Sequence, residues 1–219
     1  MSEPKAIGLS AELHAYAVAH GTPPDDVQEA LIAETSALGG ISRMQIAPEQ
    51  GTFMTLLTKL LDARFAVEVG TFTGYSSICI ARGLAPGGRL LCCDVSEDWT
   101  AIARKHWEAA GVDDRIELRI GPAADTLRGL PADPPIDLAF IDADKTGYRT
   151  YHDEIVERLR PGGVVLLDNV LWSGNVVDES DQSDDTEAIR AINDHVAHDD
   201  RVEAVMLPIA DGLTIARKL

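Results

Sequence analysis

The sequence predicts an α/β fold: a doubly wound, mainly parallel seven-stranded sheet with helices on both faces and with its last strand antiparallel. Three observations predict it. Short apolar runs rich in β-branched residues alternate with helix-length segments from Phe65 onward. These runs are apolar on both faces, which is typical of strands buried between two layers of helices. Near the C-terminus two such runs are separated only by a short turn, which indicates an antiparallel return.

The N-terminal part of the chain predicts helices. Apolar residues recur at helical spacing over Ser10–Leu38, and the stretch Thr22–Asp25 interrupts them. Two helices are therefore expected, with the second one starting at Pro23 or Pro24, because proline is favoured in the first turn of a helix. A further helix is expected over Pro48–Ala63.

The strands follow the helical segment. Their expected ranges are Phe65–Val69, Arg89–Val95, Arg115–Ile120, Ile136–Ile141, Gly163–Leu167, Val202–Leu207 and Leu213–Lys218. The last two, joined by Pro208–Gly212, are expected to close one edge of the sheet. Because 219 residues fit a single hydrophobic core, one domain is expected over residues 1–219, with residues 1–50 as a helical segment at its start.

Composition and charge exclude several classes of protein. The chain has no apolar run of the ~18 residues that a membrane span needs, and Met1–Gly8 lacks the pattern of a secretory signal. Cys79, Cys92 and Cys93 lie in apolar runs, which is typical of free thiols in a reducing compartment, so a cytoplasmic protein is expected. The net charge of −17 argues against nucleic acid and anionic membranes as partners.

A glycine-containing turn follows the first expected strand. Gly70 and Gly74 allow a ligand to approach the backbone, and the next helix offers free N–H groups. Glu68 beside the turn suits an ammonium group, and Asp94 at the end of the second strand suits the hydroxyls of a ribose. S-adenosylmethionine carries both groups. The alternative is that these are ordinary turn glycines and a solvated strand-end charge.

Oxygen-bearing side chains follow two other strands. Asp142 ends the fourth strand, and Asp168 and Asn169 end the fifth. If these strands are neighbours, the three side chains meet at one edge of the sheet as an all-oxygen set, which suits a hard cation such as Mg²⁺. The alternative is that aspartate commonly ends strands and that Asn169 caps a turn.

Several stretches resemble a known family, the cation-dependent O-methyltransferases that include catechol and caffeoyl-CoA O-methyltransferases. They are Arg43–Gly51, Val67–Ser77, Phe140–Lys145 followed by Tyr148 and Tyr151, Leu166–Trp172 and Leu207–Ile215. The resemblance extends over residues 40–219 and implies the Rossmann-like fold of class I methyltransferases. It weakens before residue 40 and across Val176–Asp185, so the choice of substrate is the property it defines least.

The resemblance also implies roles for individual residues. Asp142, Asp168 and Asn169 would bind Mg²⁺, or another divalent cation such as Mn²⁺ or Ca²⁺. Lys145 would be the catalytic base, with Asp142 beside it in the catalytic group, and Trp172 and Lys145 would contact the substrate. The residues expected around S-adenosylmethionine are Met44, Ile46, Glu68, Gly70, Phe72, Ser76, Asp94, Ala124 and Asp142.

The expected reaction is methylation of one hydroxyl of a small catechol-like substrate. A neutral phenol is a poor nucleophile, so a metal that binds both vicinal oxygens would lower the pKa of the attacking hydroxyl. Lys145 would take the proton if its own pKa is lowered by the metal or by burial. The acidic stretch Asp178–Asp185 is expected to repel a coenzyme A thioester, which favours a neutral or cationic acceptor.

Residues 1–50 are expected to cover the cofactor and to contact a second subunit in a homodimer. Trp99 and Trp107, on one expected helix, are interpreted as packing residues. A nicotinamide-dependent, NAD(P)-binding oxidoreductase is an alternative function, although the turn lacks the G-x-G-x-x-G spacing of that class. A non-catalytic S-adenosylmethionine-binding protein is the second alternative.

Overall fold

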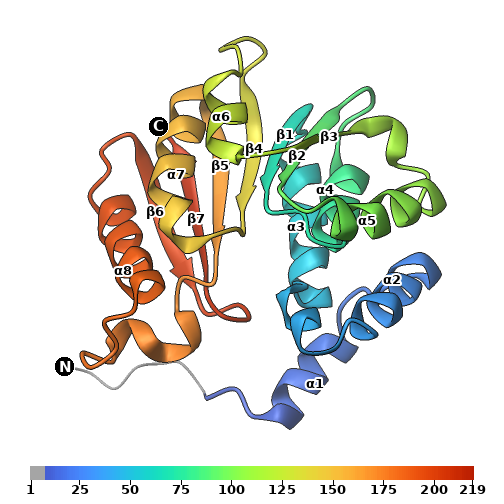
Figure 1. Cartoon of the computed structure of the whole chain (residues 1–219), viewed down its shortest axis with the longest axis horizontal. Helices are drawn as coiled ribbons and strands as arrows, with labels where there is room; N and C mark the ends of the chain where they lie inside the picture. Colours follow the sequence, from blue (N-terminus) through green and yellow to red (C-terminus); the bar gives the residue numbers. More distant parts are fainter. Residues whose placement is uncertain (1–7) are drawn as a thin grey trace.

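Figure 1 shows the computed structural model of the protein, which describes residues 8–219. A seven-stranded sheet has the order β3-β2-β1-β4-β5-β7-β6. The strands are β1 Phe65–Val69, β2 Arg89–Asp94, β3 Ile116–Ile120, β4 Ile136–Ile141, β5 Leu159–Asp168, β6 Val202–Leu207 and β7 Leu213–Lys218. The five strands β3, β2, β1, β4 and β5 are parallel, and β7 is antiparallel to both β5 and β6. The predicted fold class is confirmed.

Helices cover both faces of this sheet. The α-helices are α1 Ala11–Ala19, α2 Asp26–Ser36, α3 Pro48–Leu60, α4 Tyr75–Gly83, α5 Glu97–Ala109, α6 Ala123–Arg128, α7 Tyr148–Arg158 and α8 Asp184–Ala197. Short 3₁₀ segments are η1 Gly39–Met44, η2 Asp113–Arg115, η3 Lys145–Gly147 and η4 Trp172–Val177. Within residues 8–219 no helix is both long enough and apolar enough to cross a membrane. The expected absence of a secretory signal concerns Met1–Gly8, and residues 1–7 of this stretch lie outside the described part of the chain.

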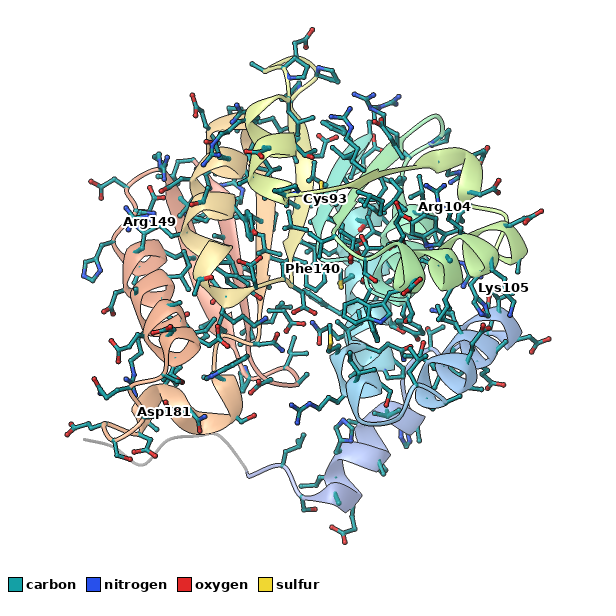
Figure 2. All side chains as sticks on the ribbon, in the orientation of Figure 1. Cys93, Arg104, Lys105, Phe140, Arg149 and Asp181 are labelled. Carbon is teal, nitrogen blue, oxygen red and sulfur yellow. The ribbon has the colours of Figure 1, made fainter. Side chains whose placement is uncertain are left out.

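Two hydrophobic cores form because successive strand side chains point to opposite faces of the sheet. In β1, Phe65, Val67 and Val69 pack in the core that lies under α6, α7 and α8. Ala66 packs in the other core, which α3, α4 and α5 cover on the opposite side in Figure 1. Figure 2 shows Phe140 of β4 at the centre of the molecule, between these two groups of helices. The sheet is therefore buried on both faces, as the apolar strands predict.

The N-terminal helices extend this second layer. The carboxylate of Glu34 in α2 forms an ion pair with Lys105 of α5 at 2.6 Å, and Figure 2 shows Lys105 beside α2. The hydroxyl of Thr35 donates to Thr73 Oγ1, in the glycine turn, at 2.8 Å. These contacts hold α2 against the part of the fold that carries the turn.

The predicted starts of two elements are wrong by two positions or more. The second helix begins at Asp26 and not at Pro23 or Pro24, because the Asp25 side chain accepts the N–H of Gln28 in a capping box that defines the start. Strand β5 begins at Leu159, four positions before Gly163, because Leu159 still pairs with Ile136 ahead of a register shift. Neither difference moves the carboxyl end of a strand.

Candidate active site

A cleft of about 1200 Å³ opens at the carboxyl ends of the parallel strands. Side chains and backbone after β1, β2, β4 and β5 form its floor, and the segment 43–50 forms one wall. Strands β4 and β5 are direct neighbours, and β1 pairs with both β2 and β4. The glycine turn and the oxygen-bearing strand ends, which are far apart in the sequence, therefore line the same cleft.

The glycine turn after β1 is shaped by close backbone contact and by Asp94. Gly70 has φ +89°, and a Cβ there would lie 1.8 Å from the carbonyl oxygen of Asp142, so only glycine fits. Asp94 Oδ2 accepts the backbone N–H groups of Thr71 and Phe72 at 2.9 and 2.8 Å. The carboxylate expected to bind a ribose thus also holds the turn in place, and it lines the cleft with its remaining surface.

Backbone strain concentrates around this cleft. Within residues 8–219, six non-glycine residues have positive φ, and five of them line the cleft: Phe72, Asn169, Trp172, Ser173 and Ala210. Such conformations cost free energy and persist only where surrounding contacts enforce them, which is most common at functional sites. One such contact is the bond from the Ser173 N–H to Asp211 Oδ1, at 2.6 Å.

Lys145 lies at the centre of the oxygen-bearing group. Its Nζ donates to Asp142 Oδ1 at 3.2 Å, to Asn169 Oδ1 at 2.7 Å and to the hydroxyl oxygen of Tyr148 at 2.7 Å. The Lys145 residue is only 8% exposed. Two of the three predicted metal ligands therefore already direct an oxygen at a single positive charge.

Asp168, the third predicted ligand, is also buried. Its Oδ1 accepts the backbone N–H of Asn169 at 2.8 Å, and its Oδ2 accepts Nε2–H of Gln50 at 2.9 Å. Burial, followed by the charge of Asp142, raises the pKa of Asp168 to about 7. Burial also raises the pKa of Asp142, an effect that Lys145 partly offsets.

The donor set fits a divalent cation. All three predicted ligands present oxygen atoms, which hard cations prefer over nitrogen or sulfur. The two carboxylates are costly to ionise together at this buried edge, and the charge of a divalent ion would stabilise both ionised forms. The residues present are therefore suited to hold Mg²⁺.

Most of the residues predicted to surround the cofactor line the cleft. They are Met44, Ile46, Gly70, Phe72, Ser76, Asp94 and Asp142, and the predicted substrate residues Lys145 and Trp172 line it as well. Met44 and Ile46 reach it from the N-terminal wall, in and just after η1. Trp172 lies on the side of the metal-ligand group, with Lys145 Nζ 5.6 Å from its ring centre.

Two predicted cofactor residues do not line the cleft. Glu68 is fully buried on the α4 side of β1, where its Oε2 accepts Ser77 Oγ–H at 2.5 Å and Cys92 Sγ–H at 3.2 Å. Burial raises the pKa of this carboxyl to about 7. Ala124 follows Ala123, which does line the cleft. The contacts of Glu68 and Ala124 with the cofactor therefore stay predictions.

Sequence reasoning missed other lining residues. Trp107 is buried as expected. Trp99 packs edge-on against Phe72, with 5.2 Å between ring centroids, and it also lines the cleft, which its interpretation as a packing residue did not include. Gln50 belongs to the stretch Arg43–Gly51, which resembles the family, but the resemblance implied no role for it. The sequence contains no local signal for its bond to Asp168, because 118 positions separate the two residues.

Comparison with known proteins agrees with this geometry. A family model described as O-methyltransferase matches residues 20–219. The chain belongs to the O-methyltransferase family. The match covers the whole cleft, and it overturns the alternative of a nicotinamide-dependent oxidoreductase.

Individual relatives support the assignment. This O-methyltransferase is 41% identical over 208 residues to "Probable caffeoyl-CoA O-methyltransferase 1" of Dictyostelium discoideum, covering 93% of this chain and 90% of the relative. The O-methyltransferase of Bacillus cereus, solved in complex with SAH, has a TM-score of 0.87 and 33% identity, covering 95% of this chain and 97% of the other. TomG of Streptomyces achromogenes, involved in tomaymycin synthesis and solved in complex with SAM, has a TM-score of 0.87 and 28% identity, covering 94% and 96%.

Proposed function

We propose that this enzyme transfers the methyl group of S-adenosylmethionine to one hydroxyl of a small catechol-like, vicinal dihydroxy aromatic substrate, with the help of a divalent cation. The observation that carries the proposal is the gathering of Asp142, Asp168, Asn169 and Lys145 in the same cleft as the glycine turn. Mg²⁺ is the proposed ion, with Mn²⁺ or Ca²⁺ as alternatives, because the ligands are all oxygen atoms.

The cofactor is proposed to lie along the glycine turn. Phe72, Trp99 and Ile46 offer apolar surface there, and Asp94 offers a carboxylate next to the turn. Ser76 lies in the first turn of α4, whose N–H groups suit a carboxylate such as that of the methionine portion. Glu68 and Ala124, which do not line the cleft, would support the cofactor site from the layer of residues behind the lining. Solved relatives with SAH or SAM support the cofactor.

The chain's own residues would prepare the acceptor. The ion, when bound by Asp142, Asp168 and Asn169, supplies positive charge that lowers the pKa of a hydroxyl beside it. Lys145 Nζ lies next to oxygens of Asp142 and Asn169. The positive charge of a bound ion would favour the neutral amine of Lys145, and in that form the amine would be placed to accept the proton that this hydroxyl loses. Trp172 would flank the aromatic ring and keep water from that side of the cleft.

The experiment is a methylation assay on the full chain with S-adenosylmethionine and a panel of catechols. We expect turnover with Mg²⁺, loss of turnover with EDTA, and recovery when Mg²⁺ is returned in excess, because a chelated acceptor hydroxyl ionises more easily. A matched monohydroxy compound, which cannot chelate through two oxygens, serves as the control substrate and should react poorly. Full activity in EDTA would contradict the metal requirement, and cofactor binding without methylation of any catechol would favour a non-catalytic binding protein.

The acceptor is proposed to be neutral or cationic. Asp144, Asp185 and Asp211 line the cleft besides the proposed metal ligands, and the net charge is −17. The negative field of these carboxylates would repel a polyanionic coenzyme A thioester. The same charge argues against nucleic acid as a partner, and the free buried cysteines support a cytoplasmic location.

A further inference from the structure

One hydrogen bond joins the N-terminal wall of the cleft to the metal-ligand group. Gln50, in the first turn of α3, donates from Nε2 to Asp168 Oδ2 at 2.9 Å. Gln50 and Asp168 are 1% and 2% exposed. A buried bond of this kind is kept because neither group has water as an alternative partner.

The bond completes a pair of contacts that orient the Asp168 carboxylate. Oδ1 accepts the N–H of Asn169, and Oδ2 accepts Gln50, so a rotation of the carboxylate plane would disturb both bonds. An ionised carboxylate oxygen can accept more than one bond, so each oxygen keeps capacity for a cation. Outer hydrogen bonds of this type orient ligating carboxylates in metal sites.

The helix that carries Gln50 is held in place next to it. A Cβ on Gly51 would lie 2.7 Å from the ring of Tyr75 and 2.7 Å from Cys79 Sγ, so α3 approaches α4 at close range at this position. This contact lets α3 lie directly against α4, and Gln50, the preceding residue, donates to Asp168 from there.

A neutral amide suits this position chemically. A lysine or arginine would neutralise Asp168 and compete with a divalent cation, whereas a carboxylate would add a third negative charge beside Asp142 and Asp168. Glutamine supplies a donor and leaves the negative charge of Asp168 available.

We propose that Gln50 is a positioning residue for metal binding: it holds Asp168 in the orientation that a divalent cation requires, from the wall that also carries Met44 and Ile46. This inference rests on the metal site of the proposed function. It assigns to α3 a role in the metal centre in addition to its role in packing.

The test measures the affinity of the purified chain for Mn²⁺, used as the probe, by titration calorimetry and by the electron paramagnetic resonance signal of free Mn²⁺. Gln50→Leu keeps the approximate volume and removes the donor. Gln50→Asn keeps the amide but is one methylene shorter. For both variants we expect Mn²⁺ affinity to fall by roughly 10- to 100-fold, the usual cost of losing an outer hydrogen bond to a ligand, with little change in SAH affinity.

Thr58→Val is the matched control. Thr58 is a buried polar residue of the same helix, and its hydroxyl donates to the carbonyl of Met54. This variant should keep wild-type Mn²⁺ affinity. Equal Mn²⁺ affinity in wild type, Gln50→Leu and Gln50→Asn, or an equal loss in Thr58→Val, would overturn the role of Gln50. Absence of Mn²⁺ binding in the wild type would instead overturn the metal requirement of the proposed function.

Discussion

The Lys145 side-chain nitrogen is buried between carboxylate, amide and phenol oxygens. Lys145 is the first residue of η3. A short turn that begins with Asp142 connects the end of β4 to η3. The hydroxyl of Tyr148 accepts a hydrogen bond from Lys145 Nζ and donates to the backbone carbonyl of Asp168 at 3.1 Å. The side chain therefore has few alternative positions, and a base that must meet a proton at a defined atom benefits from such restriction.

Replacing Lys145 tests its proposed role as the base. Lys145→Met keeps the apolar stem and removes the ammonium group, so we expect kcat for catechol methylation to fall by roughly 100-fold or more, the usual contribution of a positioned general base. SAH affinity, measured by calorimetry, should change little. Lys105→Met, at a lysine whose side chain is 65% exposed, is the control. A Lys145→Met enzyme with wild-type kcat at neutral pH would remove the lysine from the mechanism.

Helices α7 and α8 and the start of β6 are joined by a charged cluster. Ligand atoms of His152, Asp153, His195 and Asp199 lie within 4.8 Å of one another. The Arg201 guanidinium donates to Asp153 Oδ1 at 2.6 Å and to Asp199 Oδ2 at 2.7 Å. Because this guanidinium already provides the positive charge, we interpret the cluster as an ion-pair network that ties the two helices together.

The cluster predicts a dependence of stability on pH. Hydrogen bonds led by Arg201 lower the pKa of Asp153 to about 2, against burial that would raise it, and Arg201 also lowers the pKa of Asp199 well below its usual range. A carboxyl with a lowered pKa stabilises the fold above its unfolded pKa, and this contribution is lost as pH falls toward the folded value. Arg201→Gln should therefore lower Tm at neutral pH.

The difference in Tm between wild type and Arg201→Gln should shrink as pH falls from about 4 toward 2. Over this range the carboxyls of the unfolded chain take up protons, so the advantage of the ionised, paired carboxylates in the folded wild type is progressively lost. Thermal melts followed by circular dichroism across this range measure it. Arg149→Gln, at an exposed arginine that pairs with Asp153 within α7, is the control and should have a smaller effect. A Tm difference that stays constant down to pH 2 would contradict the interpretation.

At the scale of the whole molecule, helix α1 does not pack into either hydrophobic core. None of the residues of α1 is buried, and Leu13 and Tyr16 in α1, with Leu9 just before it, are exposed apolar side chains. Contact with α3 is polar, through His14 and Glu49 at 2.7 Å. An exposed apolar surface on a highly charged protein is typical of an interface.

We therefore expect a homodimer in which α1 is covered by the second subunit. Light scattering coupled to gel filtration should give twice the chain mass of 23.6 kDa. A variant with Leu13→Asp and Tyr16→Asp should shift toward the monomer, because it would place charges in an apolar interface. Val177→Asp, at an 84% exposed side chain in η4, is the control. A monomeric wild type would contradict the expectation.

Local patterns in the chain were sufficient for the fold and for much of the cleft. The predicted strand ranges Phe65–Val69, Ile136–Ile141 and Leu213–Lys218 agree with β1, β4 and β7, because burial of one or both faces of a strand determines the spacing of its apolar residues. The positions of Asp142 and Asp168 at strand ends were predicted from the same spacing. Parallel strands place these ends at one edge of the sheet. The prediction that the side chains meet depended on the two strands being neighbours, and the pairing of β4 with β5 in the structure fulfils that condition.

Only contacts between distant segments decided the rest. Four features depend on how separate elements pack. They are the side of the sheet on which Glu68 lies, the bond from Gln50 to Asp168, the edge contact of Trp99 with Phe72 and the exposure of α1. A sequence records which residues are apolar and how they are spaced, but not the distance between side chains that folding brings together. For this O-methyltransferase, amino-acid order therefore determined the scaffold and the chemical groups of the cleft, and packing determined which of those groups face one another.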